Sequence, residues 1–331
     1  AIAEGLKSEK KIYVLLPASL KRNYTEELKK CGDLLYRKNQ YWQFLNISEK
    51  PELLESLSSI LQISLESIKK NNGAWFINYK IKEPNYDKLS SADKESLDKQ
   101  LDLMIENKYI FIHYNGINSK RYNEITKNET INPFDNNVVI IDEAHNFISM
   151  IVNKLKNDTR SKEPTHVNTK LYNLLLKAEN NKIILLTGTP IINYPNEIGV
   201  MMNILRGNIK VWNFKLIIKD STKIDEQTIQ KYLKNGLESK FIFDLIQYDS
   251  RSNILKITRN PFYFNTDFGS DDIYNGVSKI APYINDNDFK ELIIKELKKY
   301  KIEIDKSSIQ LQLFDCLPDT LDNFISEFLE I

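Results

Sequence analysis

Residues 138–145 read Val-Val-Ile-Ile-Asp-Glu-Ala-His, an apolar run that ends in two carboxylates and a histidine. Four β-branched residues without polar alternation are typical of a central strand covered on both faces, which favours a largely parallel α/β sheet. Ligands of such sheets bind beyond the carboxyl ends of the strands. The stretch therefore predicts that Asp142 and Glu143 lie at a crevice at the edge of the sheet.

Adjacent carboxylates at a strand end have two interpretations. One carboxylate can face the hydrated metal of a magnesium nucleotide while the other polarises an attacking water molecule. Alternatively, the strand runs into a helix whose first turn carries Asp142 and Glu143 to complement the helix dipole. These residues alone do not decide between the two, because short motifs also match by chance.

Length, charge and composition restrict the class of protein. The 331 residues suffice for one large or two ordinary domains, and 46 Lys and Arg nearly balance 45 Asp and Glu, so any polyanion site must be local. Cys31 and Cys316 lie far apart, and the three histidines show no metal-ligand spacing. No apolar segment approaches the roughly 20 residues of a membrane span, and no signal peptide is evident. We expect an intracellular protein without membrane segments or disulfides.

The sequence predicts a first strand at residues 11–16. Ser19 follows at the turn, with Lys21 and Arg22 directly behind it. A hydroxyl and two cations after a strand end suit a phosphate contact, since helix starts and basic side chains bind phosphates. The alternative is an ordinary helix cap with solvated charges.

A second predicted strand, residues 109–114, is closed by the turn dipeptide Asn115-Gly116 and followed by Lys120 and Arg121. Two strands that both lead into basic pairs place these pairs on the same edge of a parallel sheet, where a polyanion could lie. His113, within this strand, is interpreted as a sheet histidine with satisfied hydrogen bonds rather than as a ligand.

A third buried strand, residues 182–186, ends in Thr187-Gly188-Thr189-Pro190. Two hydroxyls that flank a glycine allow this loop to hydrogen-bond to the neighbouring acidic pair while shifting easily. The alternative is a generic strand-to-loop turn.

The rhythm of the pattern indicates two parts, residues 1–207 and 208–331, with an elaboration around residues 48–108 packed on the first. The aromatic stretch 36–44 is interpreted as core rather than as a base-stacking surface. In the second part the alternating α/β rhythm fails and an α+β segment is expected. The predicted elements are helices 51–70, 97–107, 146–156, 167–179, 195–205, 288–300 and 320–331, and a β-hairpin of 241–249 with 253–258.

Three motifs, each after an apolar strand, occur in the order Pro17-Ala18-Ser19, Asp142-Glu143-Ala144-His145 and Thr187-Gly188-Thr189-Pro190. Together they resemble motifs Ia, II and III of superfamily 2 (DEAH-box) helicase-like motors, especially the Snf2-like branch. The longer strings DEAHNF and LLTGTPIINYPNE are similar to those in helicases of large nucleocytoplasmic DNA viruses, which are related to poxvirus nucleoside triphosphatase I and the early transcription factor small subunit. The similarity extends to residues 114–116, 258–262 and 316–320.

The resemblance implies a RecA-like P-loop NTPase core of three layers, here an incomplete first motor domain, with ATP and Mg²⁺ as cofactors. Asp142 and Glu143 would be the metal site: Asp142 would hold Mg²⁺ through water, and Glu143 would orient or deprotonate the attacking water. His145 would couple the nucleotide to the loop of Thr187, Gly188 and Thr189. The implied nucleic-acid edge of the motor domain comprises Ser19, Lys21, Arg22, Asn115 and Gly116.

The implied activity is ATP hydrolysis coupled to movement on DNA or RNA, in viral transcription or genome handling, in the host cytoplasm (viral factory) or the virion. Partners would include viral RNA polymerase or transcription factor subunits. One alternative is a motor-fold binding module that docks a polymerase through residues 208–331, and another is a non-motor P-loop ATPase. The family's Gly-Lys-Thr phosphate loop and the arginine finger of a second motor domain are absent from this sequence, which by itself is expected neither to bind ATP tightly nor to hydrolyse it.

Overall fold

The computed structural model describes residues 10–158, 166–218, 224–237, 243–259, 264–268, 274–280 and 284–314. The chain divides into two compact units: a first unit of Ala1–Leu174 with Asn181–Glu197, and a second unit of Leu175–Asn180 with Ile198–Ile331. The predicted helix at residues 320–331 and the family-like string at 316–320 lie outside the described residues, as does most of the string at 258–262.

The first unit is built on a four-stranded parallel sheet in the order β4-β1-β5-β6. The strands are β1 (Ile12–Leu16), β4 (Tyr109–His113), β5 (Val138–Ile141) and β6 (Lys182–Leu185). Strand β5 pairs on both edges and is buried throughout, because its apolar side chains are covered on both faces. The predicted parallel α/β sheet with 138–141 as an inner strand is confirmed.

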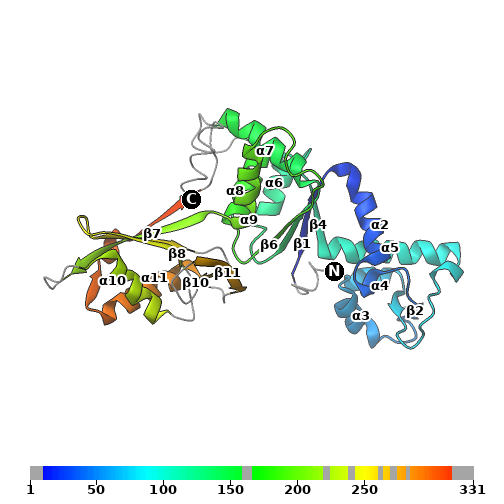
Figure 1. Cartoon of the computed structure of the whole chain (residues 1–331). Coiled ribbons are helices and arrows are strands. Elements are labelled where there is room, and N and C mark those ends of the chain that lie inside the picture. The colour runs from blue at the N-terminus through cyan, green and yellow to red at the C-terminus, as the bar shows by residue number, and fades with distance from the viewer. Residues whose placement is uncertain are drawn as a thin grey trace. The chain divides into compact units, whose positions relative to one another are not determined.

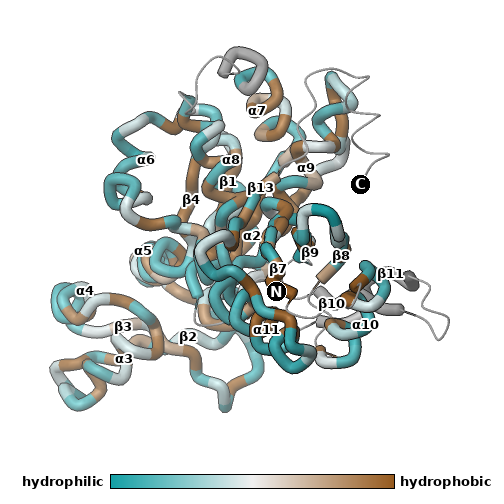
Figure 2. Tube along the Cα trace, turned by 90° about the vertical axis from the view of Figure 1, so that its left-hand side faces the viewer, coloured by the Kyte–Doolittle hydropathy of each residue, from teal (hydrophilic) through white to brown (hydrophobic). Residues whose placement is uncertain are grey.

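Helices cover both faces of this sheet. In Figure 1, α2 (Lys21–Cys31) and α5 (Ser91–Lys108) lie on one side, and α6 (Ser119–Thr126) and α7 (Ala144–Asp158) lie on the other. Alternate residues of β1, such as Ile12 and Val14, join one buried cluster with Leu97 and Leu101 of α5. Figure 2 shows hydrophobic colour along β4 and hydrophilic colour along α6. The unit is therefore a layered α/β domain compatible with a RecA-like core.

An antiparallel hairpin of β2 (Trp42–Asn46) and β3 (Gly73–Ile77) forms the elaboration, together with α3 (Leu53–Leu61) and α4 (Leu65–Lys70). The prediction of one helix over residues 51–70 is wrong. Gln62 adopts a left-handed conformation (φ 53°) that ends α3, and the Ser64 side chain accepts from the Ser67 amide to begin α4. Tyr36 and Trp42 are buried at 5% and 1% exposure, as the core interpretation of the aromatic stretch expects, but Phe44 at its end is 38% exposed, so the interpretation holds for only part of the stretch.

The second unit contains an antiparallel sheet in the order β12-β7-β9-β8, with β13 also paired to β7. Its apolar face packs with Phe289 and Ile293 of α11 and Ile229 of α10 in one buried cluster. The predicted hairpin across residues 250–252 is confirmed as β8 and β9. The bounds are β7 (Ile209–Ile218), α10 (Glu226–Gly236), β8 (Phe243–Asp249), β9 (Ile254–Arg259), α11 (Asp286–Lys299), β12 (Ile302–Ile304), β13 (Gln310–Phe314), and a separate hairpin of β10 (Phe264–Phe268) and β11 (Tyr274–Ile280).

Two further helices, α8 (Val167–Lys177) and α9 (Asn196–Arg206), each have residues in both units. Short 3-10 turns occur at Ala18–Leu20, Leu34–Tyr36, Tyr86–Lys88 and Lys306–Ser308. Within the described ranges, no helix is both long enough and apolar enough to span a bilayer.

The side chain of Gln100 on α5 makes hydrogen bonds to the backbone of β3 of the kind that a neighbouring strand would make. Its Oε1 accepts a hydrogen bond from the Trp75 amide at 2.7 Å, and its Nε2 donates to the Trp75 carbonyl at 2.8 Å. Gln100 is only 8% exposed, so both backbone groups of Trp75 are satisfied away from water.

We therefore expect Gln100→Leu to destabilise the protein by about 2–4 kcal/mol, because it leaves a buried N–H and a buried C=O without partners. Chemical denaturation would measure the change. Gln43→Leu, at an exposed glutamine of β2, is the matched control and should shift stability by less than about 0.5 kcal/mol. Equal stability of the two variants would show that the Gln100 contacts contribute nothing.

Candidate functional site

The backbone that follows β5 is held by the strands on both sides of it. The Asp142 amide donates to the Leu15 carbonyl of β1 at 2.8 Å, and the Leu186 amide donates to the Ile141 carbonyl at 2.9 Å. The Ala144 amide in turn donates to the Leu186 carbonyl at 2.9 Å. Asp142 and Glu143 therefore lie at the carboxyl end of the sheet, between the ends of β1 and β6.

Glu143 turns the chain sharply before α7 begins at Ala144. Its φ of 48° lies in the left-handed region, which costs a non-glycine residue about 1–2 kcal/mol. The first turn of α7 carries no acidic residue, so the two carboxylates precede the helix instead of lying within it. The arrangement differs from the alternative in which the pair belongs to the first helical turn.

The side chain of Tyr114 stabilises this turn through hydrogen bonds to its backbone. Its hydroxyl lies 3.1 Å from the carbonyl oxygens of both Asp142 and Glu143, to which it donates, and the residue is only 1% exposed. Burial, and then the negative charges of the two carboxylates, raise the pKa of Tyr114 above its ordinary value, so the hydroxyl stays protonated and remains a donor at neutral pH. The sequence pattern assigns Tyr114 no role, because it is the last residue of the predicted strand 109–114, whereas β4 ends one residue earlier at His113.

The two acidic side chains are half-buried and differently engaged. Asp142 Oδ1 accepts from the Glu143 amide at 3.0 Å, which fixes one of its oxygens over the turn. The Glu143 side chain is 43% exposed, and its Oε2 lies 3.5 Å from His145 Nδ1. Both carboxylates are therefore placed at the sheet edge with access to solvent.

His145 connects the acidic pair to the loop after β6. Its Nδ1 forms a hydrogen bond of 2.8 Å with Thr187 Oγ1, and the same hydroxyl accepts from the Thr189 amide at 3.2 Å. The sequence predicted a bond from this loop to the acidic pair; the bond found is with the histidine beside Glu143. Gly188 lies exposed between the two threonines.

The predicted nucleic-acid residues follow two neighbouring strand ends, because β1 and β4 are paired with Leu16 opposite His113. The prediction that His113 has satisfied hydrogen bonds is wrong for its Nδ1, which is buried without a partner in the described part of the chain. Ser19 and Arg22 are exposed, as are Asn115 and Gly116 after β4. Lys21 is partly engaged: its Nζ lies 3.4 Å from Glu106 Oε1 and 5.4 Å from the ring centroid of Phe111.

Magnesium suits the donors at the end of β5. Among the described residues, no three His, Cys, Asp or Glu side chains converge on a point that could hold a metal. Mg²⁺ does not need such a cage, because it is usually held by one or two carboxylates together with waters and phosphate oxygens. Asp142 and Glu143 fit that requirement, whereas a zinc site of four protein ligands does not.

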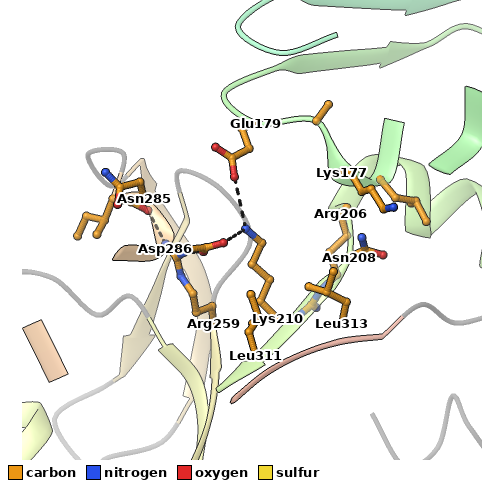
Figure 3. Close-up of a pocket in the computed structure, with 14 residues that line it drawn as sticks. Lys177, Glu179, Arg206, Asn208, Lys210, Arg259, Asn285, Asp286, Leu311 and Leu313 are labelled. Atoms are coloured by element: carbon orange, nitrogen blue, oxygen red, sulfur yellow. Dashed lines mark hydrogen bonds and ion pairs between the residues drawn. The ribbon is translucent and has the colours of Figure 1, made fainter. Parts of the chain in front are cut away.

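A cavity of ≈ 230 Å³ lies in the second unit (Figure 3). Lys210 of β7 reaches into it, with Nζ 2.7 Å from Asp286 Oδ2 and 3.9 Å from Glu179 Oε1. Arg259 of β9 also bonds to the Asp286 carboxylate, donates to the Ile284 carbonyl at 2.6 Å and lies 4.7 Å from the ring centroid of Phe289. These contacts tie β7 and β9 to the start of α11, where Asp286 complements the helix dipole, so we assign the cluster a structural role.

The first unit is thus a parallel α/β domain compatible with a RecA-like core, with an acidic pair at the end of an inner strand and a histidine that links this strand end to the next strand's loop. The chain is 30% identical over 209 residues to a protein of Acanthamoeba polyphaga mimivirus named as a putative ATP-dependent RNA helicase (R563). The aligned residues make up 62% of this chain and 26% of that protein. It is 26% identical over 231 residues to nucleoside triphosphatase I of Melanoplus sanguinipes entomopoxvirus (65% of this chain, 34% of that protein) and 27% identical over 214 residues to that of Choristoneura biennis entomopoxvirus (56% and 31%).

These matches span about a quarter to a third of the length of the relatives. No protein-family model matches the chain.

Removing the Tyr114 hydroxyl tests its role beneath the turn. We expect Tyr114→Phe to lower the free energy of unfolding by about 1 kcal/mol, because two carbonyl oxygens lose their shared donor next to a left-handed residue. Tyr79→Phe, at a tyrosine that is 64% exposed, is the control and should change little. A Tyr114→Phe protein as stable as the control would mean that the hydroxyl does not brace the turn.

Proposed function

We propose that the first unit is the nucleotide-hydrolysing core of an ATP-dependent nucleic-acid helicase or translocase. The observation that carries this proposal is the bond between His145 and Thr187 at the end of the β5–β6 pair, with Glu143 beside the histidine. A structural turn needs no such chain of side chains from one strand end to the next. The names of the relatives, an RNA helicase and two nucleoside triphosphatases, support the same activity.

In this proposal Asp142 and Glu143 form the magnesium side of the site. Bound Mg²⁺ would neutralise charge on the phosphates of ATP. Glu143, whose side chain is 43% exposed, is the residue that orients or deprotonates the attacking water. His145 contacts both Glu143 and Thr187 and fixes their relative positions. Hydrolysis of the bound phosphate would therefore change the conformation of the loop that contains Gly188 and Thr189.

The nucleic acid would lie across the ends of β1 and β4. Ser19, Arg22, Asn115 and Gly116 are exposed there, and Lys21 needs only to leave a solvent-exposed partner, Glu106, to reach a phosphate. Contacts of this kind bind the backbone and carry no sequence information. We therefore propose a sequence-independent DNA or RNA track.

We further propose a DEAH-box, Snf2-like motor that works in viral transcription or genome handling, with this sequence supplying part of its first motor domain. The phosphate loop and the second motor domain would come from elsewhere in the whole protein. Polymerase or transcription factor subunits are the proposed partners.

Glu143→Gln in the whole protein tests the proposal. Because the amide cannot take up a proton from water, we expect kcat for ATP hydrolysis to fall at least about 100-fold while nucleotide binding persists. Hydrolysis assays with and without nucleic acid, together with nucleotide binding by calorimetry, make the measurement.

Glu66→Gln, at an exposed glutamate of α4, is the matched control and should leave hydrolysis unchanged. Undiminished turnover in Glu143→Gln would remove the catalytic role of Glu143. It would leave a binding module with a motor-like fold as the better account.

A further inference from the structure

The loop after β6 is tied to α7 at a second point, beyond the Thr187–His145 bond. Asn193 Nδ2 donates to Ser149 Oγ of α7 at 2.8 Å and lies 3.4 Å from Glu197 Oε1. The other carboxylate oxygen of Glu197, Oε2, accepts from the amides of Ile192 at 2.8 Å and Asn193 at 3.2 Å. All these residues belong to the first unit.

The two ties lie on one face of α7. His145 and Ser149 are four residues apart, which places them one above the other on the helix. His145 holds the loop at Thr187 and Ser149 holds it at Asn193, and the intervening residues 188–192 are exposed. The segment is therefore a bridge fixed at both ends to the helix that begins directly after the acidic pair.

Glu197 is the anchor of the second tie. It is only 1% exposed, and a carboxylate so far from water must be compensated by hydrogen bonds. It lies in the first turn of α9, where the helix dipole favours an acid, and this alone would explain its type. A helix start does not require a bond from the preceding loop to Ser149, however, and that bond joins the anchor to α7.

We propose that Ser149, Asn193 and Glu197 are positioning residues for the nucleotide site: they fix the far end of the bridge so that Thr187 meets His145 when ATP is hydrolysed. The inference rests on the proposed function. Loss of the Asn193–Ser149 hydrogen bond would let residues 188–192 move. The rate of phosphate hydrolysis would fall, although no group that contacts the nucleotide is removed. The rate of hydrolysis should respond and nucleotide affinity should not.

The test is a double-mutant cycle in the whole protein with Ser149→Ala and Asn193→Ala. Each single variant should lower kcat about three- to tenfold, the equivalent of one hydrogen bond, while KM for ATP stays within about twofold. The double variant should be no slower than the slower single variant, because both remove the same tie.

Two further variants separate positioning from general stability. Ser58→Ala removes a similar hydrogen bond, from Ser58 Oγ to the Ile63 carbonyl at 2.7 Å, far along the chain in the elaboration, and should leave kcat unchanged. Glu197→Ala should slow hydrolysis, and Glu197→Gln should restore most of the rate because its carbonyl oxygen can still accept from the two amides.

Unchanged kcat in both single variants, with Glu143→Gln inactive, would overturn this inference and leave the proposed function standing. A loss of kcat that follows melting temperature, with Ser58→Ala affected equally, would also overturn it. Full turnover in Glu143→Gln would instead remove the proposed function on which it rests.

Discussion

The pairing of β5 with β1 on one edge and β6 on the other is the constraint on which the candidate site depends. Because all three strands run in parallel, their carboxyl ends meet, and the chain segments that leave them must lie together. The backbone bonds from Asp142 to Leu15 and from Ala144 to Leu186 continue this pairing beyond the strands. The acidic pair and the Thr187 loop are thus neighbours because of the sheet, before any side chain contributes.

Within that frame, the site holds an unfavourable local conformation. Glu143 is left-handed, and strain of this kind persists only where the surroundings determine it. The Tyr114 hydroxyl, which donates to two carbonyl oxygens of the turn, and the Asp142 carboxylate, which accepts from the Glu143 amide, supply the compensating bonds. The strained residue carries the carboxylate that lies 3.5 Å from His145 Nδ1, and the same imidazole nitrogen lies 2.8 Å from Thr187 Oγ1. If this turn served only to connect β5 and α7, glycine would adopt its left-handed conformation with less conformational strain than glutamate.

The sequence carried the parallel sheet and the positions of its strands, because runs such as 138–141 and 182–186 are apolar. The expected burial of 182–186 is wrong, since β6 ends the described strand order, is only partly buried along its length, and is followed by Leu186 at 42% exposure. It also placed Asp142, Glu143 and Thr187 at strand ends, which follows from topology alone. What it could not show depends on three-dimensional contacts between distant residues. Gln100 hydrogen-bonds to Trp75 within β3, 25 residues earlier in the chain, and Ser149 accepts a hydrogen bond from Asn193, 44 residues later. No local sequence pattern predicts either contact.

Local conformation explains the remaining differences. The break between α3 and α4 depends on a left-handed Gln62 and a Ser64 cap inside a continuous apolar pattern, so periodicity alone read it as one helix. In the second unit, the long strand β7 was not predicted, since its central place in an antiparallel sheet depends on partners as far away as β13. The roles of Asp142, Glu143 and His145 remain proposals that the geometry supports.

We propose that the end of β5 is the metal and water side of an ATP site. The structure of the whole protein with Mg²⁺ and a non-hydrolysable ATP analogue would test it most directly. We expect the ion about 4 Å from the Asp142 carboxylate through a bound water, with the terminal phosphate facing Glu143 and the His145–Thr187 bond intact. A nucleotide bound elsewhere, with Asp142 and Glu143 left to solvent, would contradict it.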